Sequence, residues 1–349
     1  MKRIITSAFG LIILFAACKK DQDSNTCPPL GKEQAWTKYD GNPVFTKGVN
    51  SWDDGFGIGH SVIRSGNGFK MWYSGSSSSN PEDGGGIGYA TSADGIHWTR
   101  YSGNPVFKGS FGSWDQGYVA VPVVLQDGNK LHMWYLGGPG PDGGKIGYAT
   151  SQDGIHWDRY PSPVFESVAG GWYRDGLLPG AVLKEKGIFK MWFSGSIGSL
   201  QQSTPTTENS IGYATSPDGI HWKVYDDPAT TNAPYNLSDP VVKHGAPGEW
   251  DVTSALSPSV LKTACGYEMW YAGENLSAGQ QNLGYAISPD GIHWAKDPKN
   301  PVLLTDPWNV MLVFPTVILH GNEYSMWYGG FTFDGVSLGG AIGYATMPR

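Results

Sequence analysis

Cysteine, positive charge and long apolar segments are scarce in this sequence, and each shortage excludes a class of fold, partner or membrane attachment. The 349 residues include only 3 cysteines, too few for disulfides to replace a hydrophobic core. Charged residues make up 16% of the chain, the formal net charge is −7, and Lys and Arg do not cluster, so nucleic acid is not an expected partner. The long apolar run, residues 4–17, is too short to span a bilayer as a stable anchor.

The N-terminal segment has the pattern of an export signal. A charged start, Met1–Arg3, precedes the apolar run, and the run ends in Phe-Ala-Ala followed by Cys18. This ending resembles the lipobox of bacterial lipoproteins. The resemblance implies cleavage before Cys18, lipidation of Cys18 and attachment to the membrane through the lipid alone. An ordinary secretory signal is the alternative.

The segment after Cys18 is polar and contains consecutive prolines, which is typical of a tether. We therefore expect a signal over 1–17, a tether over 18–35 and one folded domain over 36–349. The expected location is the bacterial cell envelope, on the outer membrane, facing the periplasm or the surface.

Glycine and proline, at 50 and 24 residues, are abundant, and the sequence is repetitive. Residues 87–98 read Ile-Gly-Tyr-Ala-Thr-Ser-Ala-Asp-Gly-Ile-His-Trp, and close copies start at Ile146, Ile211 and Leu283, with a truncated copy at Ile342. Asp-Gly is a strong hairpin signal, so the phrase predicts two strands joined by a tight turn. Its aspartates are expected to form turns. The spelling Ser-x-Asp-Gly-x-x-Trp resembles the Asp box of sialidases, shortened by one residue.

Two further elements recur with this phrase. Met-Trp followed by Tyr or Phe occurs five times, and so does a Trp that precedes an apolar run. Each copy, here called repeats 1 to 5 in chain order, therefore has four expected strands: the apolar run (A), the Met-Trp strand (B), the Gly-Tyr-Ala strand (C) and the His-Trp strand (D). Four-stranded units repeated in this way are typical of propeller blades.

We thus expect an all-β fold, a five-bladed β-propeller with four antiparallel strands per blade. Repeat 5 lacks strand D, and the segment around Trp36 matches it, so an N-terminal strand should pair with the C-terminal blade and close the ring. The 15 Trp equal three repeated positions in five repeats, which favours core packing for all of them.

Strand order separates the connections onto two faces. If strand A begins at the face here called upper, the short A–B and C–D turns lie on the lower face. The D–A and B–C connections then lie on the upper face, and the B–C connections differ in every repeat. Variable loops on a rigid scaffold carry binding and catalysis, so the site is expected on the upper face around the start of the A strands.

The apolar-Pro-x-Val-Leu entry of strand A, the hairpin after it and the Met-Trp-Tyr-Ser-Gly strand together resemble the five-bladed glycoside hydrolases of families 43, 32, 68 and 130. The resemblance implies a carbohydrate substrate and two carboxylates flanking the glycosidic bond, on inner strands and usually in an Asp-Pro step. The residues before that proline position, none of them acidic, are Gly59, Val121, Leu178, Ser257 and Phe314. The absence of this pattern either argues against hydrolysis or moves the catalytic carboxylates to other positions.

Repeat symmetry filters the acidic residues. An Asp follows the Trp before strand A in three repeats, at 53, 115 and 251, which favours a turn-capping role over chemistry. Asp54, Asp175 and Glu274 have no counterparts in other repeats, and we predict them to be the catalytic carboxylates. Solvated loop carboxylates are the alternative.

The same filter selects substrate-binding candidates. Arg64 and Arg174 have no counterparts, and Arg174 could bind a sugar hydroxyl or a uronate, or form a local ion pair. His60 replaces the proline of the other A strands and could contact a sugar or a metal, or only hydrogen-bond at the top of its strand.

Three aromatic residues complete the predicted site. They could stack on a sugar ring or pack between blades, and they are Phe56, Tyr118 and Tyr173. No cofactor is expected and no metal spacing of Cys and His is present; a calcium ion on the axis is allowed by the resemblance to some family 43 members.

Two functions of different class follow. The favoured one is a surface-anchored glycoside hydrolase acting on plant or microbial oligo- or polysaccharide, and the alternative is a non-catalytic glycan-binding lipoprotein. A protein-interaction scaffold is less supported, because the upper loops are polar and rich in glycine. We expect a monomer. Cys27 and Cys265 should both lie on the lower face, as a disulfide or as two unrelated thiols.

Overall fold

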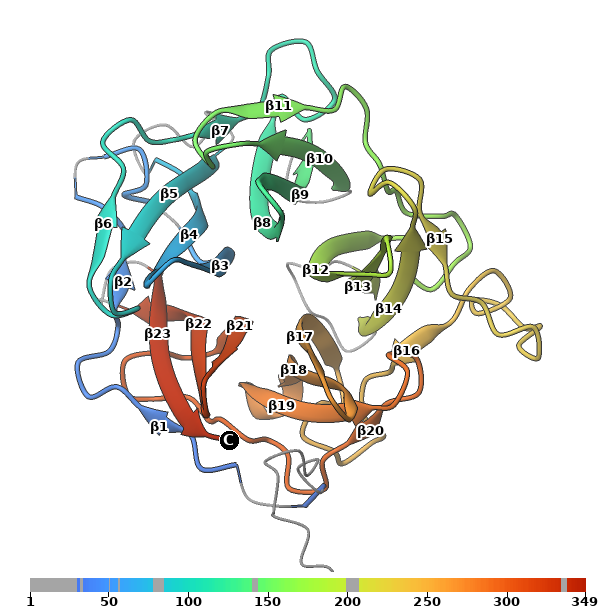
Figure 1. Ribbon diagram of the computed structural model, residues 1–349. Coiled ribbons are helices and arrows are strands. Elements are labelled where there is room, and N and C mark those ends of the chain that lie inside the picture. The colour runs from blue at the N-terminus through green and yellow to red at the C-terminus, as the bar shows by residue number, and fades with distance from the viewer. Residues whose placement is uncertain are drawn as a thin grey trace, which may run out of the picture.

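The computed structural model describes residues 30–31, 34–49, 51–55, 57–77, 85–139, 144–198, 207–333 and 338–349. Over these residues the chain is all-β: apart from the 3-10 turn η2 (Leu276–Ala278), the regular elements are strands. The strands form meanders arranged around a central axis (Figure 1). None of the helical structure described is long and apolar enough to cross a membrane.

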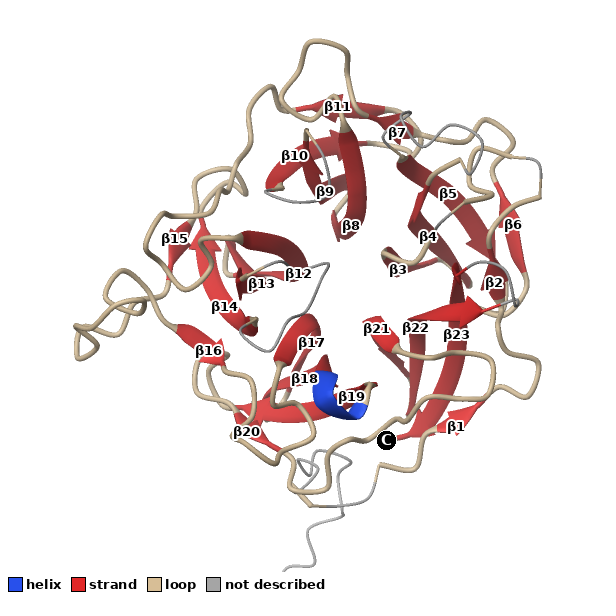
Figure 2. Cartoon of the chain, turned by 180° about the vertical axis from the view of Figure 1, so that it is seen from behind, coloured by secondary structure: helices blue, strands red, loops and turns tan. Residues whose placement is uncertain are grey.

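Each repeat contains three longer antiparallel strands and a short fourth strand on the third. Repeat 1 consists of β3 (His60–Ser65), β4 (Gly68–Gly75), β5 (Gly86–Ser92) and β6 (Trp98–Arg100); repeat 2 of β8 (Tyr118–Asp127), β9 (Lys130–Gly138), β10 (Lys145–Ser151) and β11 (Trp157–Arg159); repeat 3 of β12 (Gly176–Glu185), β13 (Ile188–Ile197), β14 (Glu208–Ser216) and β15 (Lys223–Val224); repeat 4 of β17 (Ser254–Thr263), β18 (Gly266–Asn275), β19 (Gln280–Ser288) and β20 (Ala295–Lys296); and repeat 5 of β21 (Leu312–His320), β22 (Glu323–Phe333) and β23 (Leu338–Pro348). The first strand of each repeat lies nearest the axis (Figure 2).

The N-terminal strand β1 (Thr37–Lys38) provides the short fourth strand of repeat 5. It pairs antiparallel with β23, with Thr37 opposite Thr346 and Lys38 opposite Ala345. The neighbouring Trp36 ring packs edge-on against Trp270 at a centroid distance of 6.1 Å. The pairing expected for the segment around Trp36 is therefore present.

A further short segment, which was not predicted from the sequence, pairs antiparallel with strand C in every repeat. It forms β2 (Phe45–Thr46) on β23, β7 (Phe107–Lys108) on β5 and β16 (Pro240–Val242) on β14. Phe165 and Leu303 make single bridges at the matching places in repeats 2 and 4. The signal was available in the sequence as a recurring Pro-Val followed by an apolar residue.

The tryptophan of strand B ties each repeat to the next. The Trp72 indole N–H donates to the carbonyl of Gly154 in repeat 2 at 2.8 Å. Trp134, Trp192 and Trp327 make the same bond to Gly219, Gly291 and Gly95. Trp270 has no such turn to reach and donates to Oε1 of Gln34 at 3.1 Å. Because these indoles are fully buried, each bond removes the cost of an unpaired N–H.

The repeated aspartates form turns, as predicted. Asp94 Oδ1 accepts the backbone N–H groups of Ile96 and His97 at 2.9 and 2.8 Å, and Oδ2 contacts the His97 ring at 2.7 Å. These hydrogen bonds hold the pKa of Asp94 well below its usual range. The following strand begins only at Trp98, so the turn is wider than the two-residue hairpin that Asp-Gly predicts.

Candidate functional site

The first strands of the five repeats, β3, β8, β12, β17 and β21, line a cavity on the axis. Its volume is about 750 Å³, open solvent at its mouth included. Among the described lining residues, most are apolar, some are Ser or Thr, and His60 is the one ionisable side chain. Nothing in this lining supplies the pair of carboxylates that glycoside hydrolysis needs.

The positions at which the family resemblance would place carboxylates face this cavity in three repeats. Val121, Ser257 and Phe314 line it, and each has a positive φ, of 49°, 53° and 49°. Such a φ is strained for a non-glycine residue and marks a bulge in strand A. The backbone N–H groups of Val121 and Ser257 each donate at 2.8 Å to a serine hydroxyl of the preceding repeat, Ser74 and Ser194.

Apolar side chains meet at this level of the axis. Val121 packs in a buried cluster with Ala120 and Leu136, and Tyr118, Leu178 and Phe314 pack against the cluster. The bulged positions thus line the axial cavity, and at two of them the side chains, Val121 and Phe314, belong to or pack against one apolar cluster. Tyr118, predicted to stack on a sugar, takes part in this contact.

His60 lies beside the cavity and is 6% exposed. Its Nδ1 is 2.9 Å from the carbonyl oxygen of Ile58, and its Nε2 has no hydrogen-bond partner among the described residues. Burial lowers the pKa of His60, so the ring is neutral at pH 7.

The three predicted carboxylates begin or end strands on the upper face. Asp54 belongs to the turn before β3, where its backbone N–H donates to Ser51 at 3.2 Å. Asp175 immediately precedes β12, is exposed, and accepts the N–H of Gly198 at 2.8 Å. Glu274 lies near the end of β18 and accepts the hydroxyl of Ser254 at 2.9 Å. Their catalytic role stays a prediction.

Glu274 belongs to a chain of polar groups at the seam between repeats 3 and 4. The Asn209 side-chain amide donates to Ser254 Oγ at 2.8 Å, and Ser254 Oγ donates to Glu274. Asn209 and Ser254 are fully buried, and Asn209 Oδ1 has no partner among the described residues. A parallel bridge between Asn209 and Ser254 joins the strands of both repeats into one nine-stranded sheet.

This seam is specific to repeats 3 and 4, and the sequence analysis missed two of its three residues. The places matching Asn209 in the other repeats hold Gly85, Gly144, Gln281 and Gly340. The same comparison between repeats that selected Glu274 would have selected Asn209.

The remaining predicted residues are dispersed. Arg64 is exposed at the far end of β3 from His60, next to the Gly66 turn, and so lies on the lower face. Tyr173 is 4% exposed and packs against Phe193 and Trp172 in the core. Phe56 and Cys18 lie outside the described residues.

The shared aspartates are buried and paired. Asp53 accepts the Tyr73 hydroxyl at 3.2 Å and the Arg100 Nε at 2.9 Å. Asp115 pairs in the same way with Tyr135 and Arg159, and Asp251 with Tyr271 and Lys296. These carboxylates hold strands B and D to the Trp-Asp turn, so their role is structural, as the repeat comparison indicated.

A second cavity, here called the off-axis cavity, lies beside repeat 3 on the upper face. It is open, with a volume of about 880 Å³ including solvent, and its lining is Gly170, Arg174, Ile197, Glu208, Ala233, Pro234 and Tyr235. Arg174 Nε is 3.4 Å from Asp175 Oδ2, and Glu208 Oε2 is 3.8 Å from His244 Nε2. It shares no lining residue with the axial cavity.

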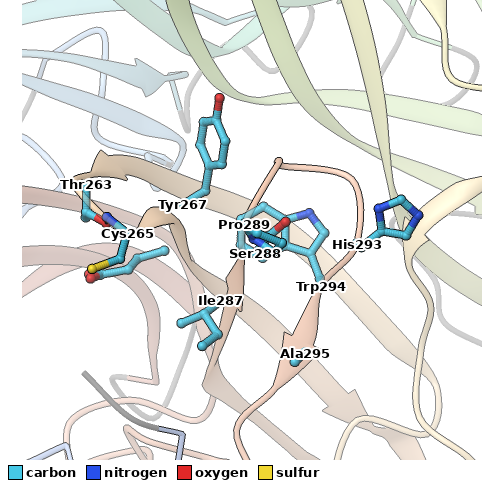
Figure 3. A pocket seen from close by; sticks show the side chains of 10 residues that line it. Thr263, Cys265, Tyr267, Ile287, Ser288, Pro289, His293, Trp294 and Ala295 are labelled. Carbon is cyan, nitrogen blue, oxygen red and sulfur yellow. The ribbon is translucent and has the colours of Figure 1, made fainter. Parts of the chain in front are cut away.

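A third cavity lies on the lower face of repeat 4, between the Thr263–Gly266 turn and the turn before β20 (Figure 3). Cys265, on its edge, is disulfide-bonded, so the free-thiol alternative does not hold for this residue; Cys18 and Cys27 lie outside the described residues. Glu268 also lines the cavity, and burial raises its pKa. Among the described residues, no group of three or more His, Cys, Asp or Glu could hold a metal ion.

Comparison with known proteins gives the following similarities. No family model matches the sequence. The uncharacterized protein Rv1502 of Mycobacterium tuberculosis (strain ATCC 25618 / H37Rv) is 23% identical over 254 residues, which are 68% of this chain and 76% of that protein. Among solved structures, a glycoside hydrolase has a TM-score of 0.68 at 17% identity, over 91% of this chain and 92% of the hydrolase.

Two more structures carry a more specific description. A thermostable family-43 glycoside hydrolase has a TM-score of 0.64 at 16% identity, over 87% of this chain and 91% of the hydrolase. The chain has the fold of the propeller-type glycoside hydrolases. The β-1,2-mannobiose phosphorylase of Listeria innocua, in complex with β-1,2-mannobiose, has a TM-score of 0.64 at 16% identity, over 90% of this chain and 97% of the phosphorylase. Since this one propeller fold carries both hydrolases and a phosphorylase, it does not by itself fix an activity.

Proposed function

We propose that this protein binds glycans through its upper face without hydrolysing them at the axis. The observation that carries the proposal is that Leu178 and Phe314 pack against the apolar cluster containing Val121, so that these three positions, where the resembled families hold carboxylates, are apolar. A glycosidase needs two carboxyl groups roughly 5–10 Å apart around the scissile bond. The described lining of the axial cavity contains none.

A glycoside hydrolase acting at the seam of repeats 3 and 4 is the second candidate, and it is the function predicted from the sequence. The contact that favours it is the chain from Asn209 through Ser254 to Glu274, which fixes a carboxylate on the upper face. Asp175, which immediately precedes β12, would be its partner. Buried polar groups that hold a carboxylate in one orientation are typical of catalytic acids and bases.

The number of blades and the closure of the ring are also part of this proposal. We infer a five-bladed propeller whose ring is closed by β1, supported by the β1–β23 pairing and by the Trp270–Gln34 bond, which stands where the other repeats use a turn. We also infer a monomer, held in the cell envelope through a lipid on Cys18 and lacking a resident cofactor or metal.

A glycan panel separates the two candidates. Purified protein lacking residues 1–18 is run through gels containing arabinan, xylan, fructan or galactan, and release of reducing ends from each glycan is measured in parallel. The variants are Asp175→Asn and Glu274→Gln, with Asp158→Asn as the control, because Asp158 is exposed on β11 at the outer edge of repeat 2.

Retardation of the wild type by at least one glycan, without product release, is the expected result. Product release that Asp175→Asn or Glu274→Gln abolishes and Asp158→Asn retains would replace the binding proposal by the hydrolase. Absence of both retardation and product release for every glycan would overturn both candidates.

A further inference from the structure

The off-axis cavity exists because repeat 3 is followed by a long excursion of the chain. Residues 225–239 connect β15 to β16, whereas residues 101–106 make the matching connection from β6 to β7. The excursion projects from the edge of the molecule beside β15 and β16 (Figure 1). It brings Tyr235 to the side of Arg174 and Glu208.

The two charged groups that line the cavity are incompletely engaged. Arg174 Nε is 3.4 Å from Asp175, and Glu208 is 3.8 Å from His244. Charge-assisted hydrogen bonds are shorter, about 2.7–2.9 Å. The guanidinium N–H groups and the carboxylate lone pairs therefore retain capacity for hydrogen bonds to a ligand.

Tyr235 adds a hydroxyl to the lining, within electrostatic reach of Glu208. Its ring is half-buried against the core of repeat 3 and is covered on one side by Lys243, whose Nζ is 4.3 Å from the ring centroid. Burial, with the nearby carboxylates of Glu208 and Asp239, raises the pKa of Tyr235, so the hydroxyl keeps its proton at neutral pH. It can donate one hydrogen bond and accept others.

The cavity therefore presents a donor, an acceptor and a group that is both. A bound anion would be repelled by the Glu208 carboxylate, and a bound cation would be repelled by the Arg174 guanidinium. Each hydroxyl group on a sugar ring can both donate and accept a hydrogen bond and carries no charge, so neighbouring hydroxyls can satisfy both side chains together.

We infer that the off-axis cavity is the glycan-binding site of the upper face, specific for uncharged sugar units, in which Arg174, Glu208 and Tyr235 hydrogen-bond sugar hydroxyls. The inference rests on the proposed function in that the ligand is a glycan. It adds that binding occurs beside repeat 3 and not at the axial cavity, whose upper contacts are apolar. A site on the outer side of the upper face fits a polymer that lies across the surface.

The test measures dissociation constants by electrophoresis in gels that contain increasing amounts of each neutral glycan, with polygalacturonate as the charged comparison. The variants are Arg174→Gln and Glu208→Gln. Lys130→Gln is the matched loss of a cation, because Lys130 is exposed in the β8–β9 hairpin on the lower face. Thermal melting of each variant shows that it is folded; Arg174 and Glu208 are both exposed, so little change is expected.

We expect each site variant to weaken binding of the retained neutral glycan about tenfold, since each removes a hydrogen bond to a charged group. Lys130→Gln should bind as the wild type does. Unchanged binding in folded Arg174→Gln and Glu208→Gln would overturn the assignment of the site to the off-axis cavity while leaving glycan binding by the protein intact. Tighter binding of polygalacturonate than of any neutral glycan would overturn the specificity for uncharged sugars. No binding of any glycan would overturn the proposed function itself.

Discussion

Repeats 2 and 3 are neighbours with the same order of strands, but they use different contacts to hold strands B and D to the turn before strand A, a place here called the corner. Repeat 2 uses a buried ion pair, and repeat 3 uses apolar packing. In repeat 2 the buried Asp115 accepts the Tyr135 hydroxyl at 2.8 Å and pairs with Arg159. In repeat 3 the matching residues are Tyr173, Phe193 and Val224, and the aromatic pair packs at a centroid distance of 5.5 Å.

The difference shows that this buried ion pair is one of two workable solutions and not a requirement of the fold. Repeat 3, which needs no charge at this corner, carries Arg174 and Asp175 on its surface directly after Tyr173. Repeat 3, which lacks this ion pair, is also the repeat beside the off-axis cavity. The inferred glycan site therefore lies where repeat 3 departs from the repeat symmetry.

The largest effect is expected when the ion pair of repeat 2 is broken on one side only. Asp115 is 0% exposed and the Arg159 side chain 18% exposed, so Asp115→Ala leaves a largely buried cation without its partner. We expect the free energy of unfolding to fall by about 3–5 kcal/mol, measured by urea denaturation.

The variant Asp115→Tyr, Tyr135→Phe, Arg159→Val gives repeat 2 the residues of repeat 3. If the two solutions are equivalent, this variant should recover most of the stability lost by Asp115→Ala, because replacing a whole buried pair by packed apolar groups is often neutral. A triple variant as unstable as the single one would show that the corners are not interchangeable.

A smaller effect is expected at the interface between repeats 2 and 3, where His132 of repeat 2 packs against Phe189 of repeat 3 at a centroid distance of 5.2 Å. Burial lowers the pKa of His132 from its ordinary 6.5 to about 4. Between pH 6.5 and about 4, His132 is therefore protonated in the unfolded chain but remains neutral in the folded protein. The free energy of unfolding should fall as the pH drops through this range.

After allowance for solvent screening, this loss should be about 1–2 kcal/mol. Chemical denaturation across this pH range should show a shallower slope for His132→Gln than for the wild type. The neutral, buried His60 has its pKa shifted in the same direction, so part of the slope should remain. Identical slopes in the variant and the wild type would contradict the assignment.

The smallest effect is expected for Tyr135→Phe, which gives repeat 2 one side chain of repeat 3. It removes the hydroxyl that donates to Asp115 but keeps the ion pair, so the expected loss is about 1 kcal/mol. Differential scanning calorimetry should show a lower melting temperature than the wild type. A loss as large as that of Asp115→Ala would mean that the hydroxyl, and not Arg159, holds the carboxylate.

The strands were predicted well because the same sequence pattern occurs in five repeats, so each strand could be identified from several copies. The Met-Trp strands, the Gly-Tyr-Ala strands and the pairing of the segment around Trp36 could all be read from matching positions. The crossing segment at Phe45 was missed because its Pro-Val signal is short and stands in what looks like a loop.

The site was predicted less well, since matching positions say which residues differ and not where their side chains point. Glu274 and Arg174 were selected because they break the pattern, but Tyr173, selected as an aromatic residue that could stack on a sugar ring, is in the core. Asn209 and Tyr235 were passed over: one is an uncharged residue whose importance comes from a buried contact across repeats, and the other stands in an excursion with no counterpart to compare.

The pairing of Thr37 with Thr346 has a consequence for how the molecule is made. The sheet of repeat 5 cannot be completed until every residue between Thr37 and Thr346 has been synthesised, because its two paired strands lie far apart along the chain. Contacts so distant along the chain form slowly, and until they do the edge of β23 is available to other strands. Chaperones that keep the segment around Thr37 apart until β23 has been synthesised would therefore govern the yield of native protein.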